Sequence, residues 1–136
     1  MPDTSALHSA SAALAAGRQV QSGRIRAISE NLANADSVPT TPGGAPYARK
    51  IAVFAPVAAD SPRDPVGRIA RDTTGFRTRY DPTSPGADPS GYVRLPNVNS
   101  AVESADLQRV VRNYELSLSA SASIKTLAQA TINLIS

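Results

Sequence analysis

Residues 29–37 have the sequence SENLANADS, and the pattern of the chain changes there. Before this stretch, apolar and small residues recur every three or four positions, which predicts one long amphipathic helix. After it, prolines and glycines replace that pattern. Asn31 and Asn34 readily bond to nearby backbone, so we interpret them as a helix C-cap followed by a turn.

The predicted N-terminal helix begins within residues 3–5, where short polar side chains can cap the first turn. Its apolar stripe contains Leu7, Leu14, Ile25, Ile28 and Leu32. Fully burying such side chains contributes about 1.5–3 kcal/mol each, whereas fixing each backbone residue costs about 1–2 kcal/mol. We therefore expect this helix to fray alone and to be ordered by packing against partners.

A second long helix is predicted in the last third of the chain. Ser100 and Glu103 fit a capping box, in which each side chain bonds to the other residue's backbone amide. Its apolar stripe includes Val110, Tyr114, Leu118 and Leu127. The two terminal helices are expected to form a coiled-coil-like pair.

The middle of the chain is rich in turn formers. Alternating side chains predict a strand within residues 47–54, a second strand in 66–72 that pairs with it, and a third in 76–80. Residues 81–91 form an extended turn region, because proline and aspartate cluster around Gly86. The whole pattern predicts an α+β fold, with long N- and C-terminal helices and a small irregular middle that contains a β-hairpin.

Composition excludes several classes of site. The 136 residues contain no cysteine and one histidine, so disulfides and histidine–cysteine zinc sites are ruled out, and we expect no metal and no cofactor. Aromatic residues make up 4% of the chain, which leaves little material for a dense core. No run has the length of a bilayer-spanning helix, and the first 20 residues lack the pattern of a secretory signal.

Nucleic-acid binding and glycoside hydrolysis are two alternative functions from other classes. The net charge of +3 and pI near 9.7 suit nucleic-acid binding, but aspartates interspersed among the central arginines are more typical of a solvated surface. Paired carboxylates would suit glycoside hydrolysis. The candidates are Asp60, Asp64, Asp72, Asp81 and Asp88. They lie in turn-rich or arginine-mixed stretches, and no apolar cleft is predicted around them, so we expect neither an enzyme nor a nucleic-acid partner.

Short motifs in the chain resemble those of bacterial flagellar rod and hook proteins. The segment Asn31-Leu32-Ala33-Asn34, after an amphipathic helix, resembles their N-terminal signature. Further along, the order and spacing of three motifs resemble the short proximal rod members of that family. These motifs are Tyr80-Asp81-Pro82, Gly91-Tyr92 and Pro96-Asn97-Val98.

The resemblance implies a structural subunit of the proximal rod in the flagellar basal body. Such a subunit assembles helically, transmits motor torque and surrounds the export channel. Implied partners are copies of the chain, other rod subunits, proteins at the MS-ring/rod junction and the flagellar export apparatus. The implied location is the periplasmic rod, reached without a cleaved signal peptide. Another rod subunit of the same family is the nearest alternative.

Under this interpretation the chain has three parts. Residues 1–36 form an N-terminal assembly helix, residues 37–98 a turn-rich β segment, and residues 99–136 a C-terminal assembly helix. The apolar stripes of the two helices supply the predicted assembly contacts. These nine residues are Leu7, Leu14, Ile25, Ile28, Leu32, Val110, Tyr114, Leu118 and Leu127.

Overall fold

The computed structural model describes residues 4–54 and 68–135 of the chain. Two long helices, α1 (Thr4–Ala33) and α2 (Ser100–Ile135), flank a middle with two antiparallel strand pairs. The strands are β1 (Lys50–Val53), β2 (Arg68–Arg71), β3 (Arg77–Tyr80) and β4 (Tyr92–Leu95). The predicted α+β organisation with terminal helices is confirmed.

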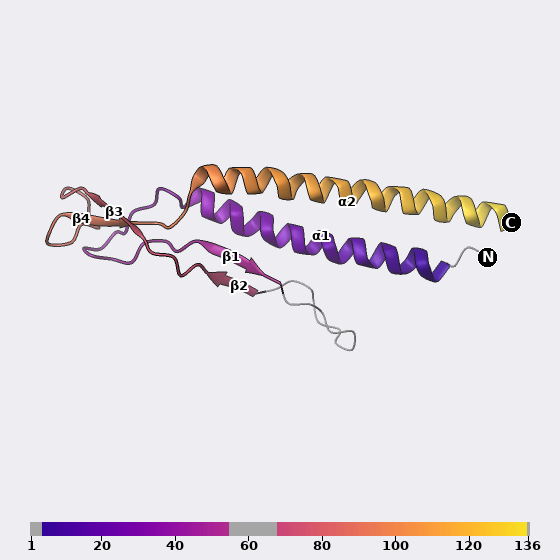
Figure 1. Cartoon of the computed structure of the whole chain (residues 1–136), viewed down its shortest axis with the longest axis horizontal. Coiled ribbons are helices and arrows are strands. Elements are labelled where there is room, and N and C mark those ends of the chain that lie inside the picture. The colour runs from indigo at the N-terminus through magenta and orange to yellow at the C-terminus, as the bar shows by residue number, and fades with distance from the viewer. Residues whose placement is uncertain (1–3, 55–67, 136) are drawn as a thin grey trace.

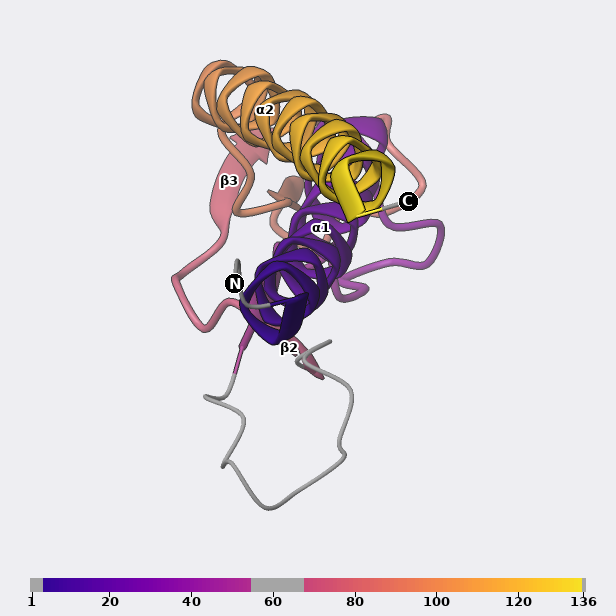
Figure 2. The ribbon, with the colours of Figure 1, turned by 90° about the vertical axis from the view of Figure 1, so that its right-hand side faces the viewer.

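The two helices lie side by side and antiparallel. Asn31 near the end of α1 contacts Glu103 near the start of α2, whereas Leu14 lies opposite Ser117, whose hydroxyl donates to the Leu14 carbonyl over 3.3 Å. Figure 1 shows the strands gathered at one end of the pair and the two outer helix ends at the other. Figure 2, viewed from the outer ends, shows α2 lying directly against α1.

At the C-terminal end of α1, the prediction is right for Asn34 and wrong for Asn31. The helix stops at Ala33, and the side-chain amide of Asn34 donates to the Glu30 carbonyl over 2.8 Å, so Asn34 closes the last turn as expected. The prediction was wrong for Asn31, which lies inside α1 and is fully buried. Its side chain forms hydrogen bonds with β1 and α2, which are distant in sequence. These contacts outweigh the local preference of asparagine for a helix end.

The start of α2 also differs from the prediction. Asn99, not Ser100, is the N-cap, because its side-chain oxygen accepts bonds from the amides of Ala101 and Val102 over 3.1 and 3.2 Å. The prediction of a capping box between Ser100 and Glu103 is therefore wrong. The Glu103 side chain is 1% exposed and turns inward to a charged partner, an interaction stronger than a bond to a neutral backbone amide.

Three of the four strands fall inside predicted ranges. β1 and β2 pair as expected, with Ile51 opposite Ala70, although Val66 and Gly67 of the predicted second strand lie outside the described residues, as do Asp60 and Asp64. β4 was not predicted. It pairs with β3, and the rings of Tyr80 and Tyr92 meet edge to face at 5.3 Å.

The turn between β3 and β4 requires a glycine. Gly91 has a φ of +83°, and a Cβ at that position would lie 2.8 Å from the Tyr80 ring. The amide of Asp81 donates to the Gly91 carbonyl over 2.9 Å, and the Asp88 carboxylate accepts the amides of Ser90 and Tyr92. The motif residues Tyr80, Asp81, Gly91 and Tyr92 thus build this turn.

Replacing Gly91 with alanine is expected to destabilise the protein by about 1–3 kcal/mol, because left-handed backbone is strained in residues that carry a Cβ. Gly75→Ala is the matched control, since nothing lies within 4 Å of its Cβ position and its φ is not in that region. Thermal unfolding followed by circular dichroism measures both. Equal melting temperatures for the two variants would contradict the role given to Gly91.

The buried interior is small and partly polar. Among the described residues, the buried apolar side chains other than prolines are Ala27, Ala35, Val93, Val98 and Val110. Asn31 and Glu103 are buried together with them. The interior therefore lies where the helix ends meet the strands, and polar contacts there must supply part of the stability.

Candidate functional site

Asn31 is the centre of a polar junction between the helices and the first hairpin. Its side-chain oxygen accepts bonds from the Lys50 amide over 2.8 Å and from the Tyr47 hydroxyl over 2.9 Å. Its side-chain nitrogen donates to the Lys50 carbonyl over 2.9 Å and to the Glu103 carboxylate over 3.1 Å. One amide thus satisfies both backbone groups of a strand residue and joins α1 to α2.

Arg49, directly before β1, makes the corresponding contact to α2. Its guanidinium donates to Glu103 over 2.5 Å and to Asp72, directly after β2, over 3.3 Å. Its backbone amide donates to the Asn97 side chain over 2.7 Å, and Asn97 donates in turn to the Thr74 carbonyl over 3.0 Å. We call this network, made of Asn31, Tyr47, Arg49, Asp72, Asn97 and Glu103, the polar junction.

Charge stabilises the polar junction and its surroundings. Bonds from Thr74 and the Arg49 guanidinium lower the pKa of Asp72, while Lys50, which pairs with Glu30, lowers the pKa of that carboxylate. The Glu30 partner raises the pKa of Lys50 in return. Burial raises the pKa of the Tyr47 hydroxyl. All these shifts favour the forms that the contacts require, and a lowered pKa at Asp72 is the opposite of what a general acid needs.

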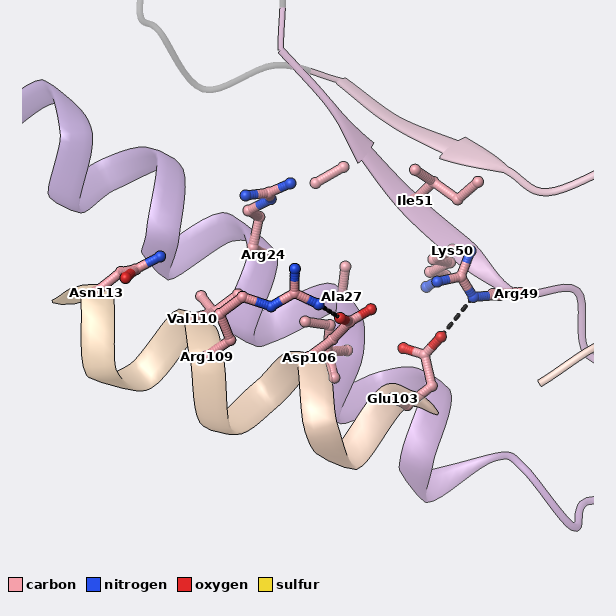
Figure 3. Close-up of a pocket in the computed structure, with 12 residues that line it drawn as sticks. Arg24, Ala27, Arg49, Lys50, Ile51, Glu103, Asp106, Arg109, Val110 and Asn113 are labelled. Carbon is pink, nitrogen blue, oxygen red and sulfur yellow. Dashed lines mark hydrogen bonds and ion pairs between the residues drawn. The ribbon is translucent and has the colours of Figure 1, made fainter. Parts of the chain in front are cut away.

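A groove borders the polar junction on the side of α2. It has a volume of about 290 Å³ and lies between α1, β1 and the first turns of α2. In Figure 3, Arg24 and Ala27 approach from α1, Ile51 from β1, and Val110 from α2. Asp106 and Arg109 pair with each other along one side of it. We call this hollow the junction groove.

The β1–β2 hairpin is held beside α1 by two further contacts. The Lys50 ammonium pairs with Glu30, and the Arg24 guanidinium lies over the Phe54 ring at 5.8 Å from its centre. A Cβ at Gly23 would lie 4.0 Å from the Phe54 ring, an ordinary van der Waals distance, so this approach does not depend on the glycine. The wall of the junction groove that β1 provides is therefore fixed.

The structure places the nine predicted assembly residues on both helices. The five on α1 are half-buried: Leu7, Leu14, Ile25, Ile28 and Leu32. On α2, Val110 is buried and Tyr114 half-buried, whereas Leu118 and Leu127 are exposed. The pairing of the helices leaves these two leucines without cover in a single chain.

Leu127, one of the predicted assembly residues, belongs to an exposed row of leucines on α2 that also contains Leu116, which sequence reasoning missed. Leu116, Leu127 and Leu134 are 63%, 55% and 88% exposed. They follow one another at spacings of 11 and 7 residues, which place them on one side of a helix. Leu116 carried the same signal in the sequence, but it lies off the apolar stripe that was predicted for α2.

The remaining motif residues have structural roles. Pro96 and Val98 are buried, and Asn97 belongs to the polar junction. Leu32, Ala33 and Asn34 form the end of α1, and Pro82 packs near Gly91, 3.2 Å from its Cβ position. Arg49 and Tyr47, also missed as junction residues, had no local signal, because the bond from Arg49 to Glu103 spans 54 residues.

Residues 4–54 and 68–135 offer neither a metal site nor a membrane-spanning helix. These residues contain no group of three or more histidine, aspartate or glutamate side chains arranged to hold a metal ion. Within the same ranges, neither helix combines the length and the apolar character needed to cross a membrane. The polar junction and the exposed leucines are thus the features that call for a function.

Comparison with known proteins identifies the family. The flagellar basal-body rod protein FlgC of Agrobacterium fabrum is 38% identical over 132 residues, which cover 95% of this chain and 95% of that protein. The chain belongs to the FlgC family. FlgC of Aquifex aeolicus is 36% identical, and the match covers 86% of this chain and 88% of that protein. FlgC of Borreliella burgdorferi is 32% identical, and the match covers 88% of this chain and 91% of that protein. No family model matches the chain.

Membership of the FlgC family makes the chain a structural protein of the flagellar basal-body rod, with a role in motility. The predicted resemblance to rod proteins is confirmed. The alternative of another rod subunit is not favoured, because these relatives are FlgC proteins aligned over most of both chains.

Proposed function

We propose that the chain is a subunit of the proximal rod, assembled helically to transmit motor torque and to surround the export channel. The observation that carries this proposal, beyond family membership, is the row of Leu116, Leu127 and Leu134 exposed along α2. Apolar side chains in a row at helical spacing favour packing against further helices. The polar junction supports it as well, because it joins the hairpin to both helices through charged hydrogen bonds.

We infer that the predicted assembly stripes act in two ways. The half-buried residues of α1, together with Val110 and Tyr114, belong to the side where the helices meet, so they shape the helix pair. Leu118 and Leu127, which remain exposed, contact neighbouring subunits directly. We also propose that each terminal helix gains much of its order from these neighbours, since the buried interior is small.

We further propose the partners and location that the resemblance implies. The partners are copies of the chain, other rod subunits, proteins at the MS-ring/rod junction and the export apparatus, with no nucleic acid and no enzymatic activity. The location is the periplasmic part of the basal body, reached without a cleaved signal peptide.

Deleting the gene is expected to abolish swimming, and an epitope-tagged copy is expected to restore it. Immunoblots of basal bodies purified from the restored strain should contain the tagged chain at its full length, since no signal peptide is cleaved. Swimming of the deletion strain, or a restored strain whose basal bodies lack the tagged chain, would contradict the proposed function. A tagged chain shortened at its N-terminus would contradict the proposed export route alone.

A further inference from the structure

The junction groove combines an apolar floor with a cationic rim. Ala27, Ile28, Ile51 and Val110 supply apolar side chains to its lining. The lining also contains four cationic side chains, Arg24, Arg49, Lys50 and Arg109, against two carboxylates, Glu103 and Asp106. The groove therefore favours an apolar occupant that carries negative charge at one end.

One cation of the rim has no carboxylate. Arg49, Lys50 and Arg109 each pair with an acidic side chain. Among the described residues no carboxylate pairs with Arg24, which lies over the Phe54 ring instead. A negative group that enters the groove would meet this guanidinium.

The C-terminal part of α2 has the complementary properties. It contains no charged residue after Lys125. Leu127 and Leu134 are 55% and 88% exposed and project from the same side of the helix, two turns apart. The last turn has no basic residue, so the partial negative charge of the helix C-terminus is not neutralised there.

These two complementary surfaces cannot meet within one chain. Leu127 lies 17 residues after Val110 on the same continuous helix, a separation of roughly 25 Å along its axis. A straight helix cannot turn back to its own beginning. The C-terminal part of α2 can therefore fill only the groove of another chain, and each chain carries both the row of leucines and the groove.

We propose that the C-terminal part of α2, with Leu127 and Leu134, docks in the junction groove of a second copy of this chain. This inference rests on the proposed assembly of the chain into a rod. Because the two surfaces differ, the contact is heterologous, and repeating it adds copies without requiring a closed dimer.

Cysteine cross-linking tests the contact directly, since the chain has no native cysteine. One copy carries Leu127→Cys and one epitope tag, and another carries Ile51→Cys and a second tag. Both are produced in a strain that also makes the unaltered chain, so that rods assemble. A short bismaleimide is added to purified basal bodies, and a cross-linked dimer with both tags is expected.

The matched control replaces Leu127→Cys with Glu115→Cys, an exposed position elsewhere on α2, and should give at least tenfold less of the dimer with both tags. Basal bodies that contain both tagged copies but no such dimer would overturn the groove contact and leave the proposed rod function intact. A dimer of equal yield from the Glu115 control would also overturn it.

A second variant tests whether the contact is required. A strain whose only copy of the chain carries Leu127→Ser and Leu134→Ser should not swim. The melting temperature of this variant should stay close to that of the control variant, because both side chains are exposed and the control also places two serines in the same helix. Gln129→Ser combined with Asn133→Ser, two exposed polar positions of the same segment, should swim normally. Normal swimming of the leucine variant would overturn the proposal.

Discussion

Replacing Val110 with aspartate is expected to unfold the helix pair and to abolish swimming. Val110 is 5% exposed and faces α1 from the first turns of α2. A carboxylate there would lose most of its hydration, and the apolar contacts of the valine would be lost with it, at a cost of about 3–5 kcal/mol. Asp106, four residues earlier on the same face, would add repulsion between like charges.

Val111→Asp is the matched control for stability, because the same change is made at the adjacent position, which is 37% exposed. Thermal unfolding followed by circular dichroism should show a drop of roughly 10 °C or more for Val110→Asp and a far smaller drop for Val111→Asp. Soft-agar swimming of a strain that makes only the Val110→Asp chain gives the functional result. Similar melting temperatures for the two variants would show that Val110 is not part of the interior.

Replacing Asn31 with alanine is expected to destabilise the protein by about 3–5 kcal/mol. The change removes four hydrogen bonds and leaves both backbone groups of Lys50 and the Glu103 carboxylate without this partner. Each buried polar group that loses its partner costs about 1–3 kcal/mol. Amide hydrogen exchange should also accelerate at Lys50, whose amide donates to the Asn31 side chain.

Asn34→Ala provides the comparison, since Asn34 belongs to the same motif but its side chain makes one bond, to the Glu30 carbonyl. It should cost about 0.5–1.5 kcal/mol. Denaturant unfolding monitored by circular dichroism measures both variants. If they lose equal stability, the polar junction contributes little, and the motif acts only through the end of the helix.

The sequence was sufficient for the elements that local patterns determine. The periodicity of α1 and α2, the alternation in β1, and the capping ability of Asn34 are all readable within a few residues. The helix pairing followed from two apolar stripes that had no other partner. The resemblance to flagellar rod proteins followed from motifs whose residues the structure places in the β3–β4 turn, the end of α1 and the polar junction.

The polar junction was not predictable because its partners are remote. Local rules favour Asn31 at a helix end and Glu103 in a capping box, and each rule is sound for an isolated helix. Contacts across 72 residues between them, and across 54 residues to Arg49, decide otherwise. β4 was missed for a similar reason, because its partner strand lies beyond a turn that depends on the positive φ of Gly91.

The long sequence separation within the helix pair has a consequence for folding kinetics. Paired helices are usually joined by a short loop, and their contacts are local in sequence. Here the bond from Arg18 to Ser121 spans 103 residues, so the helices meet only after the intervening chain has closed a large loop. In contact order the helix pair therefore resembles a β-rich protein more than a helical hairpin. A newly released chain is expected to stay open for longer than a helical hairpin does before its two ends meet.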